Sequence, residues 1–457
     1  MKKRLVLVAS CGLALAILLA GCTWFGTESL VGPQSLEVSG DYILAFSKLP
    51  SDIEATIEAY GGSVRSVLEA IDVVTVRVTQ EALVAIEGIE GFVSAAPDVN
   101  LQWLPDEQVM IDDGGEVDVS TPYFRQWNLY AIDAMGAWEE GYTGDGVRVA
   151  VCDTGIDPDH PDFGDNVNVE LSYSFVDWEP DIEDYNGHGS HVAGIIAAAD
   201  NDVRVIGVAP NAEIVALKTN DATGGGLFSF LLEALIYAAD VIDADVVNMS
   251  LGALWSHSGY VMTDSGPVYV GADAINTYAA TVRKTLDYAQ QQGVLLVASA
   301  GNSAMDGTGD AGWIHVPSDI GGCLTVSATG PQGFGLTFDP FATDLDLFAV
   351  YSNYGPQVDF AAPGGNIDWS LPYPFPLADD WVYSTYYSGY YAWVVGTSQA
   401  APHVAGVAAL IIEKNGGEMK PSHVLRELRA SIDDLGKPGQ DPYYGYGRVN
   451  AAQAVAP

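Results

Sequence analysis

The chain has 457 residues, more than one ordinary domain needs, and 48% of them are hydrophobic, so it can bury a large core and does not resemble a disordered chain. Lys and Arg total 18 against 60 Asp and Glu, which gives a formal net charge of -42. Because phosphate binding requires a basic face, we expect no nucleic-acid partner.

Four cysteines are present, two in the first 22 residues and two in the body of the chain: Cys11, Cys22, Cys152 and Cys323. Two cysteines do not make a disulfide scaffold. A bridge between Cys152 and Cys323 stays open. We favour two buried free thiols, because Cys152 lies within an apolar run and cysteine behaves as a small hydrophobe.

The N-terminus predicts an export signal. Lys2-Lys3-Arg4 precedes an apolar stretch, Leu5–Ala20, that is short for a membrane span but typical of a signal-peptide core. The stretch ends in Leu19-Ala20-Gly21-Cys22, which resembles the lipobox of bacterial lipoproteins and implies lipidation of Cys22. We therefore expect residues 1–22 to be a lipoprotein signal, with an extracytoplasmic protein tied to the cell envelope only through lipid on Cys22. The alternative is an ordinary secretory signal with a chance cysteine.

A linker over 23–37 leads into a small predicted α+β domain, 38–104. Alternating or β-branched runs indicate strands, and amphipathic runs indicate helices. This order of elements favours a small sandwich with an antiparallel sheet. The predicted strands are Asp41–Phe46, Val73–Val78 and Phe92–Ala96, and the predicted helices are Ser51–Tyr60 and Thr79–Ile86.

Residues 105–124 are acidic, contain glycine and show no clear periodicity. We expect an exposed linker, the kind of segment in which proteolytic cuts fall, and we place a processing site here without naming the bond.

Three motifs in the remaining segment, 125–457, carry polar side chains at the ends of apolar runs. A predicted buried strand ends at Asp153, and strands of parallel α/β sheets commonly deliver an acid in this way. His188 follows Asn186-Gly187, where glycine permits a tight turn into a helix. Ser398 enters an Ala-rich helix, whose N-terminus favours developing negative charge.

The order Asp, His, Ser and the sequences around these residues resemble the subtilisin family over about residues 126–456. The resemblance implies a subtilisin-like α/β fold of three layers, with a mainly parallel sheet flanked by helices. It also implies that Asp153, His188 and Ser398 form a catalytic triad. Asn302, in Ser299-Ala300-Gly301-Asn302-Ser303, takes the place of the family's oxyanion donor.

The resemblance also implies the substrate groove, in which a peptide binds as an added strand. Ser250 and Gly252 keep the pocket open for the residue before the cut, and a hydrophobic or aromatic residue is expected there. Four insertions, 253–280, 304–313, 332–350 and 365–391, either narrow the groove or decorate the surface. The residues expected to line the groove are Ser250, Leu251, Gly252, Ala300 and Gly301 on one side and Gly225 and Gly226 on the other.

A structural calcium ion is the one cofactor that the resemblance implies. Calcium prefers mixed carboxylate, amide and backbone oxygens. A loop without metal is the alternative. The ligands carried over are the side chains of Asp162 and Asn201 and the carbonyls of Ala199, Val203 and Val205.

Together these features predict a secreted serine endopeptidase that acts on proteins or peptides and is made as a precursor. Residues 38–104 loosely resemble the family's inhibitory pro-domain; an unrelated adaptor domain is the alternative. Two other functions stay open for the whole protein: a catalytically silent surface scaffold, and an acyl-transferring enzyme that acts as a transpeptidase.

Overall fold

The computed structural model describes residues 40–104, 108–112, 124–308, 312–367 and 377–457, all within one compact unit, Ser39–Pro457. The predicted signal (1–22) with Cys22, the linker 23–37, and most of the linker 105–124 lie outside the described residues. Within the described ranges, no helix combines the length and hydropathy that a membrane span requires.

The N-terminal region forms the expected antiparallel sheet with two helices against it. The sheet has the order β2-β3-β1-β4, and its inner face packs on Ile57 of α2 and Leu83 of α3. One strand, β2, was not predicted, because its side chains are mostly half-buried and do not alternate clearly. The elements are β1 (Asp41–Phe46), α2 (Ile53–Ala59), β2 (Ser63–Leu68), β3 (Val73–Arg77), α3 (Gln80–Ile86) and β4 (Phe92–Pro97).

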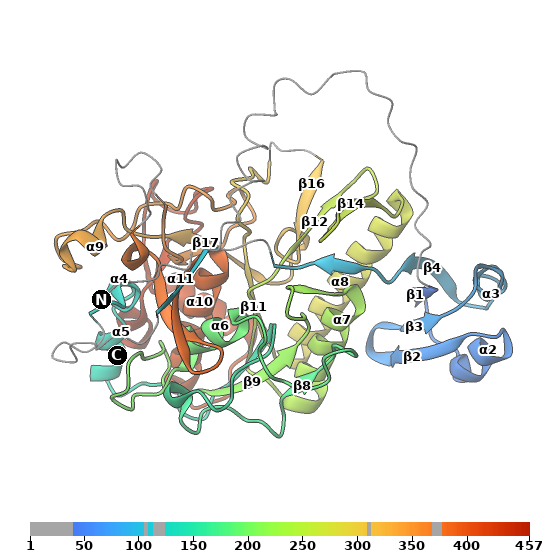
Figure 1. Cartoon of the computed structure of the whole chain (residues 1–457), viewed down its shortest axis with the longest axis horizontal. Coiled ribbons are helices and arrows are strands. Elements are labelled where there is room, and N and C mark those ends of the chain that lie inside the picture. The colour runs from blue at the N-terminus through green and yellow to red at the C-terminus, as the bar shows by residue number, and fades with distance from the viewer. Residues whose placement is uncertain (1–39, 105–107, 113–123, 309–311, 368–376) are drawn as a thin grey trace, which may run out of the picture. The chain divides into compact units, whose positions relative to one another are not determined.

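The larger region is built on a nine-stranded sheet that is parallel except at the β21–β22 pair (Figure 1). Its central strands are almost continuously apolar, as expected where helices cover both faces. The order is β21 (Ile432–Asp433), β22 (Arg448–Val449), β18 (Phe360–Pro363), β17 (Leu324–Thr329), β15 (Leu295–Ser299), β11 (Val246–Met249), β7 (Arg148–Asp153), β9 (Glu213–Lys218) and β8 (Tyr173–Ser174).

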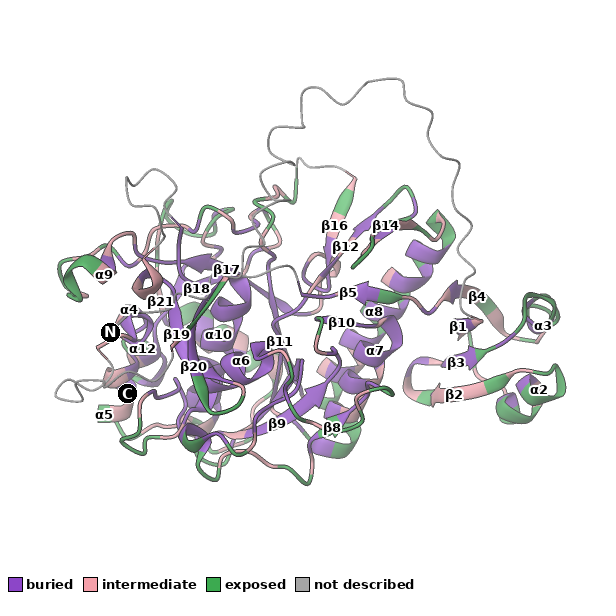
Figure 2. Ribbon diagram, viewed as in Figure 1, coloured by how far each residue is buried: buried purple, intermediate pink, exposed green. Residues whose placement is uncertain are grey.

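Successive side chains of these strands enter two separate cores, one on each face of the sheet. In β7, Val149 and Val151 belong to the first core, and Ala150 and Cys152 belong to the second. Figure 2 shows both helix layers buried where they meet the sheet. The predicted three-layer fold is confirmed. The first core contains α4 (Trp127–Ala131), α5 (Ala134–Glu139), α6 (His188–Ala197), α10 (Thr397–Lys414), α11 (Pro421–Ala430) and α12 (Ala451–Val455), and the second contains α7 (Phe228–Tyr237) and α8 (Ala272–Gln292).

The predicted linker 105–124 contains a strand, β6 (Gln108–Asp112), where none was expected. It pairs antiparallel with β20 (Tyr390–Val395), which also pairs with β19 (Val382–Tyr386). Val109, Met110 and Ile111 remain exposed. The strand is therefore held by hydrogen bonds to β20 rather than by burial of one face. For this reason its sequence shows no alternation of apolar and polar residues from which a strand could be predicted.

The insertion 253–280 forms most of a second antiparallel sheet, which is completed by β16 (Trp313–Val316). It contributes β12 (Ala253–Ser256), β13 (Tyr260–Thr263) and β14 (Gly266–Tyr269).

Polar contacts join the N-terminal sheet to the body of the molecule. Asp98 accepts hydrogen bonds from the amide and hydroxyl of Ser229, at 3.1 and 2.7 Å, in the first turn of α7. Ser66 of β2 donates to Glu233 of the same helix at 2.7 Å. A carboxylate is favourable at a helix N-terminus, so Asp98 stabilises this contact.

Cys152 and Cys323 are buried free thiols, as favoured from the sequence. Burial raises the pKa of both thiols, which keeps them protonated.

Candidate active site

Asp153 and His188 form a buried hydrogen-bonded pair at the carboxyl end of the parallel strands of the large sheet. Asp153 is the last residue of β7, and its Oδ1 lies 2.7 Å from Nδ1 of His188, the first residue of α6. Both side chains are at most 5% exposed. Burial raises the pKa of Asp153, and the neighbouring His188 opposes that shift. The pair therefore suits a carboxylate that orients an imidazole and compensates its positive charge.

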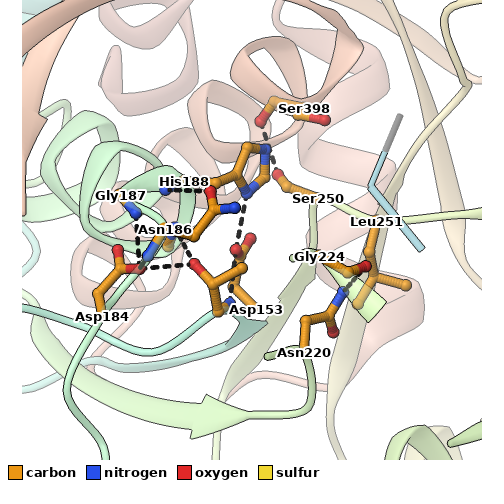
Figure 3. A network of polar contacts seen from close by, with 12 residues as sticks. Asp153, Asp184, Asn186, Gly187, His188, Asn220, Gly224, Ser250, Leu251 and Ser398 are labelled. Carbon is orange, nitrogen blue, oxygen red and sulfur yellow. Dashed lines mark hydrogen bonds and ion pairs between the residues drawn. The ribbon is translucent and has the colours of Figure 1, made fainter. Parts of the chain in front are cut away.

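Asp184 organises the turn that presents His188, and sequence analysis missed it. Its carboxylate accepts the amide of Gly187 at 2.7 Å (Figure 3). The same carboxylate accepts the amide and the hydroxyl of Ser190, both at 2.8 Å. It also accepts the Thr154 hydroxyl at 2.9 Å, which links α6 to the end of β7. Asp184 lies three residues before the N-cap, Gly187, so the usual sequence signal of an aspartate at the N-cap itself is absent.

Ser398 is the second residue of α10, and it is 3% exposed. Its carbonyl accepts a hydrogen bond from Ser250 Oγ at 2.6 Å, and Ser250 Oγ in turn accepts one from Asn248 Nδ2 at 2.9 Å. In Figure 3 the imidazole of His188 lies between Asp153 and Ser398. The three predicted triad residues thus come from one strand end and two helix starts.

Asn302 is oriented by Thr397, a second residue that sequence analysis missed. Asn302 Oδ1 accepts both the amide and the hydroxyl of Thr397 at 2.8 Å. The same hydroxyl accepts the amide of Gly301 at 2.9 Å. With its oxygen held against the first residue of α10, the half-exposed Asn302 keeps its Nδ2 donor for a ligand.

The residues predicted to bind substrate flank a segment of the same chain. Strand β10 (Gly225–Leu227) pairs antiparallel with β5 (Asn100–Gln102), with Gly226 opposite Leu101. Just beyond β5, Gly252 donates to the Trp103 carbonyl at 2.8 Å. Residues 100–104 therefore lie between the two edges at which a peptide was expected to add as a strand.

Leu251, Ala300 and Gly301 were also predicted to line the substrate groove. Leu251 is 1% exposed and packs its side chain in the second core, so only its main chain can face a ligand. The Ala300 amide donates to Val326 at 2.9 Å, and its carbonyl accepts Asn353 Nδ2 at 2.8 Å. These bonds fix Ala300 and Gly301 directly before Asn302.

The loop predicted to hold calcium brings its residues together around Asp162. Asp162 Oδ2 accepts the Val205 amide at 3.1 Å, and its carbonyl accepts the Ala199 amide at 2.6 Å. Asn201 Oδ1 accepts the Val203 amide at 3.1 Å.

Asp162 Oδ1 is buried and has no close hydrogen-bond partner among the described residues, while the Tyr391 hydroxyl interacts with the same carboxylate. A cation bound here would share this carboxylate with Tyr391. In the described part of the chain, no three His, Cys, Asp or Glu side chains are grouped to hold a metal. A calcium site here would use one carboxylate with amide and backbone oxygens.

Comparison with known proteins identifies the family of the chain. The model of the subtilase family matches residues 144–447. Subtilisin Savinase of Lederbergia lenta is 35% identical over 330 residues, which are 72% of this chain and 98% of that relative. The minor extracellular protease Epr of Bacillus subtilis is 35% identical over 333 residues, 73% of this chain but only 42% of that relative.

A solved structure with a similar fold is the epidermin leader peptide processing serine protease of Staphylococcus aureus. It has a TM-score of 0.74 at 20% identity and covers 91% of this chain and 97% of its own. The chain therefore belongs to the subtilase family and is a serine endopeptidase of the subtilisin type.

Proposed function

We propose that the protein is an exported, lipid-anchored precursor that processes itself and then cleaves proteins or peptides with Asp153, His188 and Ser398. The observation that carries the proposal is the buried 2.7 Å hydrogen bond between Asp153 and His188, next to the start of the helix that bears Ser398.

Each residue of this set has a defined role in peptide hydrolysis. A neutral serine hydroxyl is a poor nucleophile, so His188 removes its proton as Ser398 attacks the carbonyl and then gives that proton to the leaving amine. The acyl group stays on Ser398 as an ester until a water molecule, deprotonated by His188, releases it as the free acid and the proton returns to Ser398. Asp153 holds the imidazole tautomer and stabilises the imidazolium that forms. Asn302 Nδ2 and the N-terminus of the 18-residue helix α10 stabilise the negative oxygen.

Residues 38–104 act as an inhibitor in this proposal. Support comes from residues 100–104, which occupy both substrate-binding edges and so exclude another peptide. A cut within 105–124 would release them. Because Cys22 lies on the N-terminal side of that cut, processing would separate the catalytic region from its lipid.

Two alternatives differ in what happens at Ser398. A silent scaffold would keep the fold without reaction, and a transpeptidase would pass the acyl group to an amine instead of water. The complete set Asp153, His188, Ser398 and Asn302 argues against the first. Product mass separates the second from hydrolysis, because hydrolysis adds one water.

Self-processing can be tested with residues 23–457 and a Ser398→Ala variant of the same span. We expect the intact mass of the wild type to fall by a fragment that ends between residues 105 and 124, while Ser398→Ala stays whole. Ser265→Ala, at an exposed turn of the insertion sheet, is the matched control and should be processed like the wild type. If Ser398→Ala were cut as fast as the wild type in the absence of other proteases, self-processing would be ruled out.

Replacement of Asn302 by Ala should lower kcat and leave KM nearly unchanged, because the amide binds the charge that develops only in the transition state. The loss known for the corresponding asparagine of subtilisin itself is about 10²–10³-fold. Thr397→Val should also lower kcat, by less, whereas Thr397→Ser keeps the hydroxyl that holds Asn302. A change confined to KM in Asn302→Ala would contradict the assigned role.

Calcium can be tested by thermal unfolding in the Ser398→Ala background, in which self-digestion is absent. EDTA should lower the Tm, since an ion present at 100 times its Kd stabilises the folded state by about 2.7 kcal/mol. Asp162→Asn should start from a lower Tm and lose its response to EDTA. An unchanged Tm of the parent protein in EDTA would count against the site.

A further inference from the structure

A buried histidine lies between the two predicted walls of the substrate pocket. His315 belongs to β16 and faces Leu254 of β12 across the insertion sheet. A Cβ added to Gly252 would lie 2.0 Å from Cε1 and 2.3 Å from Nε2 of His315. A Cβ added to Gly301 would lie 2.7 Å from Cδ2 and 2.8 Å from Nε2 of the same ring. The imidazole therefore contacts both walls and fills the space between them.

Hydrogen bonds hold His315 in this place. Its Nδ1 lies 2.9 Å from Ser318 Oγ, and its amide donates to Asp319 Oδ2 at 2.7 Å. None of these bonds uses Nε2, the ring atom near both glycines. The side chain is thus fixed in position with Nε2 beside both glycines.

The two walls are the ones that a substrate would meet. The Gly252 amide already binds the carbonyl of Trp103, within the segment that lies in the groove as a peptide would. Gly301 directly precedes Asn302, whose amide is aimed at the reacting carbonyl in the proposed mechanism. A side chain entering between these walls ends at the imidazole.

We infer that His315 forms the floor of the pocket for the residue before the cut and restricts that residue to Gly, Ala or Ser. The inference rests on the proposed function and narrows it, since the family resemblance alone led us to expect a hydrophobic or aromatic residue at this position.

The floor is uncharged at neutral pH. Burial lowers the pKa of His315 to about 4, so the ring carries no charge that would attract an acidic side chain. Long basic side chains and aromatic rings are excluded by the space that the ring takes.

The test measures kcat/KM of the mature enzyme on blocked tetrapeptide anilides that differ only in the last residue: Gly, Ala, Ser, Leu, Phe or Tyr. We expect the wild type to prefer Ala to Phe by about tenfold or more, the scale on which pocket size discriminates. His315→Gly should raise kcat/KM on Phe by at least about tenfold and change the value on Ala little. His257→Gly, the same substitution at an exposed residue beside the same sheet, should keep the wild-type profile.

The wild-type profile tests the inference even if His315→Gly does not fold. A wild type that prefers Phe or Tyr to Ala would overturn the assignment of His315 as the pocket floor, but it would not contradict the proposed function. A properly processed wild type that cleaves none of these substrates or a denatured protein would overturn the proposed function itself.

Discussion

The hydrogen bond between Asp153 Oδ1 and His188 Nδ1 joins the end of β7 to the first residue of α6, and the rest of the site is arranged around it. The bond requires helix and strand to approach closely. A Cβ at Gly189 would lie only 2.1 Å from the Gly155 carbonyl, so a larger residue there would push α6 away from the strand. Asp184 then binds the free amides of that helix and the hydroxyl of Thr154, which keeps the imidazole facing Asp153.

Parallel strand pairing brings Ser250 and Asn302 to the same end of the sheet as Asp153. Strand β11 lies between β7 and β15, with Val246 opposite both Val149 and Leu295, so the chain leaves all three strands on one side. Asp153 ends β7, while Ser250 and Asn302 follow β11 and β15. Helix α10 begins against these ends, and its first two residues hold Asn302 and Ser250. The register of the parallel strands and the positions at which α6 and α10 begin thus bring the site residues together.

Features that depend on local sequence could be predicted, and so could the candidate site residues. Asp153, His188 and Ser398 lie in compact motifs, and strands such as β1 and β7 carry clear hydrophobic patterns. Features that depend on a partner distant in the chain could not be predicted from the sequence. Strand β6 exists because β20 offers it an edge. The role of Thr397 depends on Asn302, 95 residues earlier, and the position of His315 between Gly252 and Gly301 follows only from the fold.

The central claim is that Ser398 is activated by His188 and Asp153, and covalent labelling tests it most directly. The processed wild type can be treated with a fluorophosphonate, digested and mapped by mass spectrometry, beside a His188→Ala variant processed in trans. We expect one phosphonylated residue, Ser398, and loss of labelling in His188→Ala. Labelling of another serine such as Ser250, or equally rapid labelling of Ser398 without His188, would contradict it.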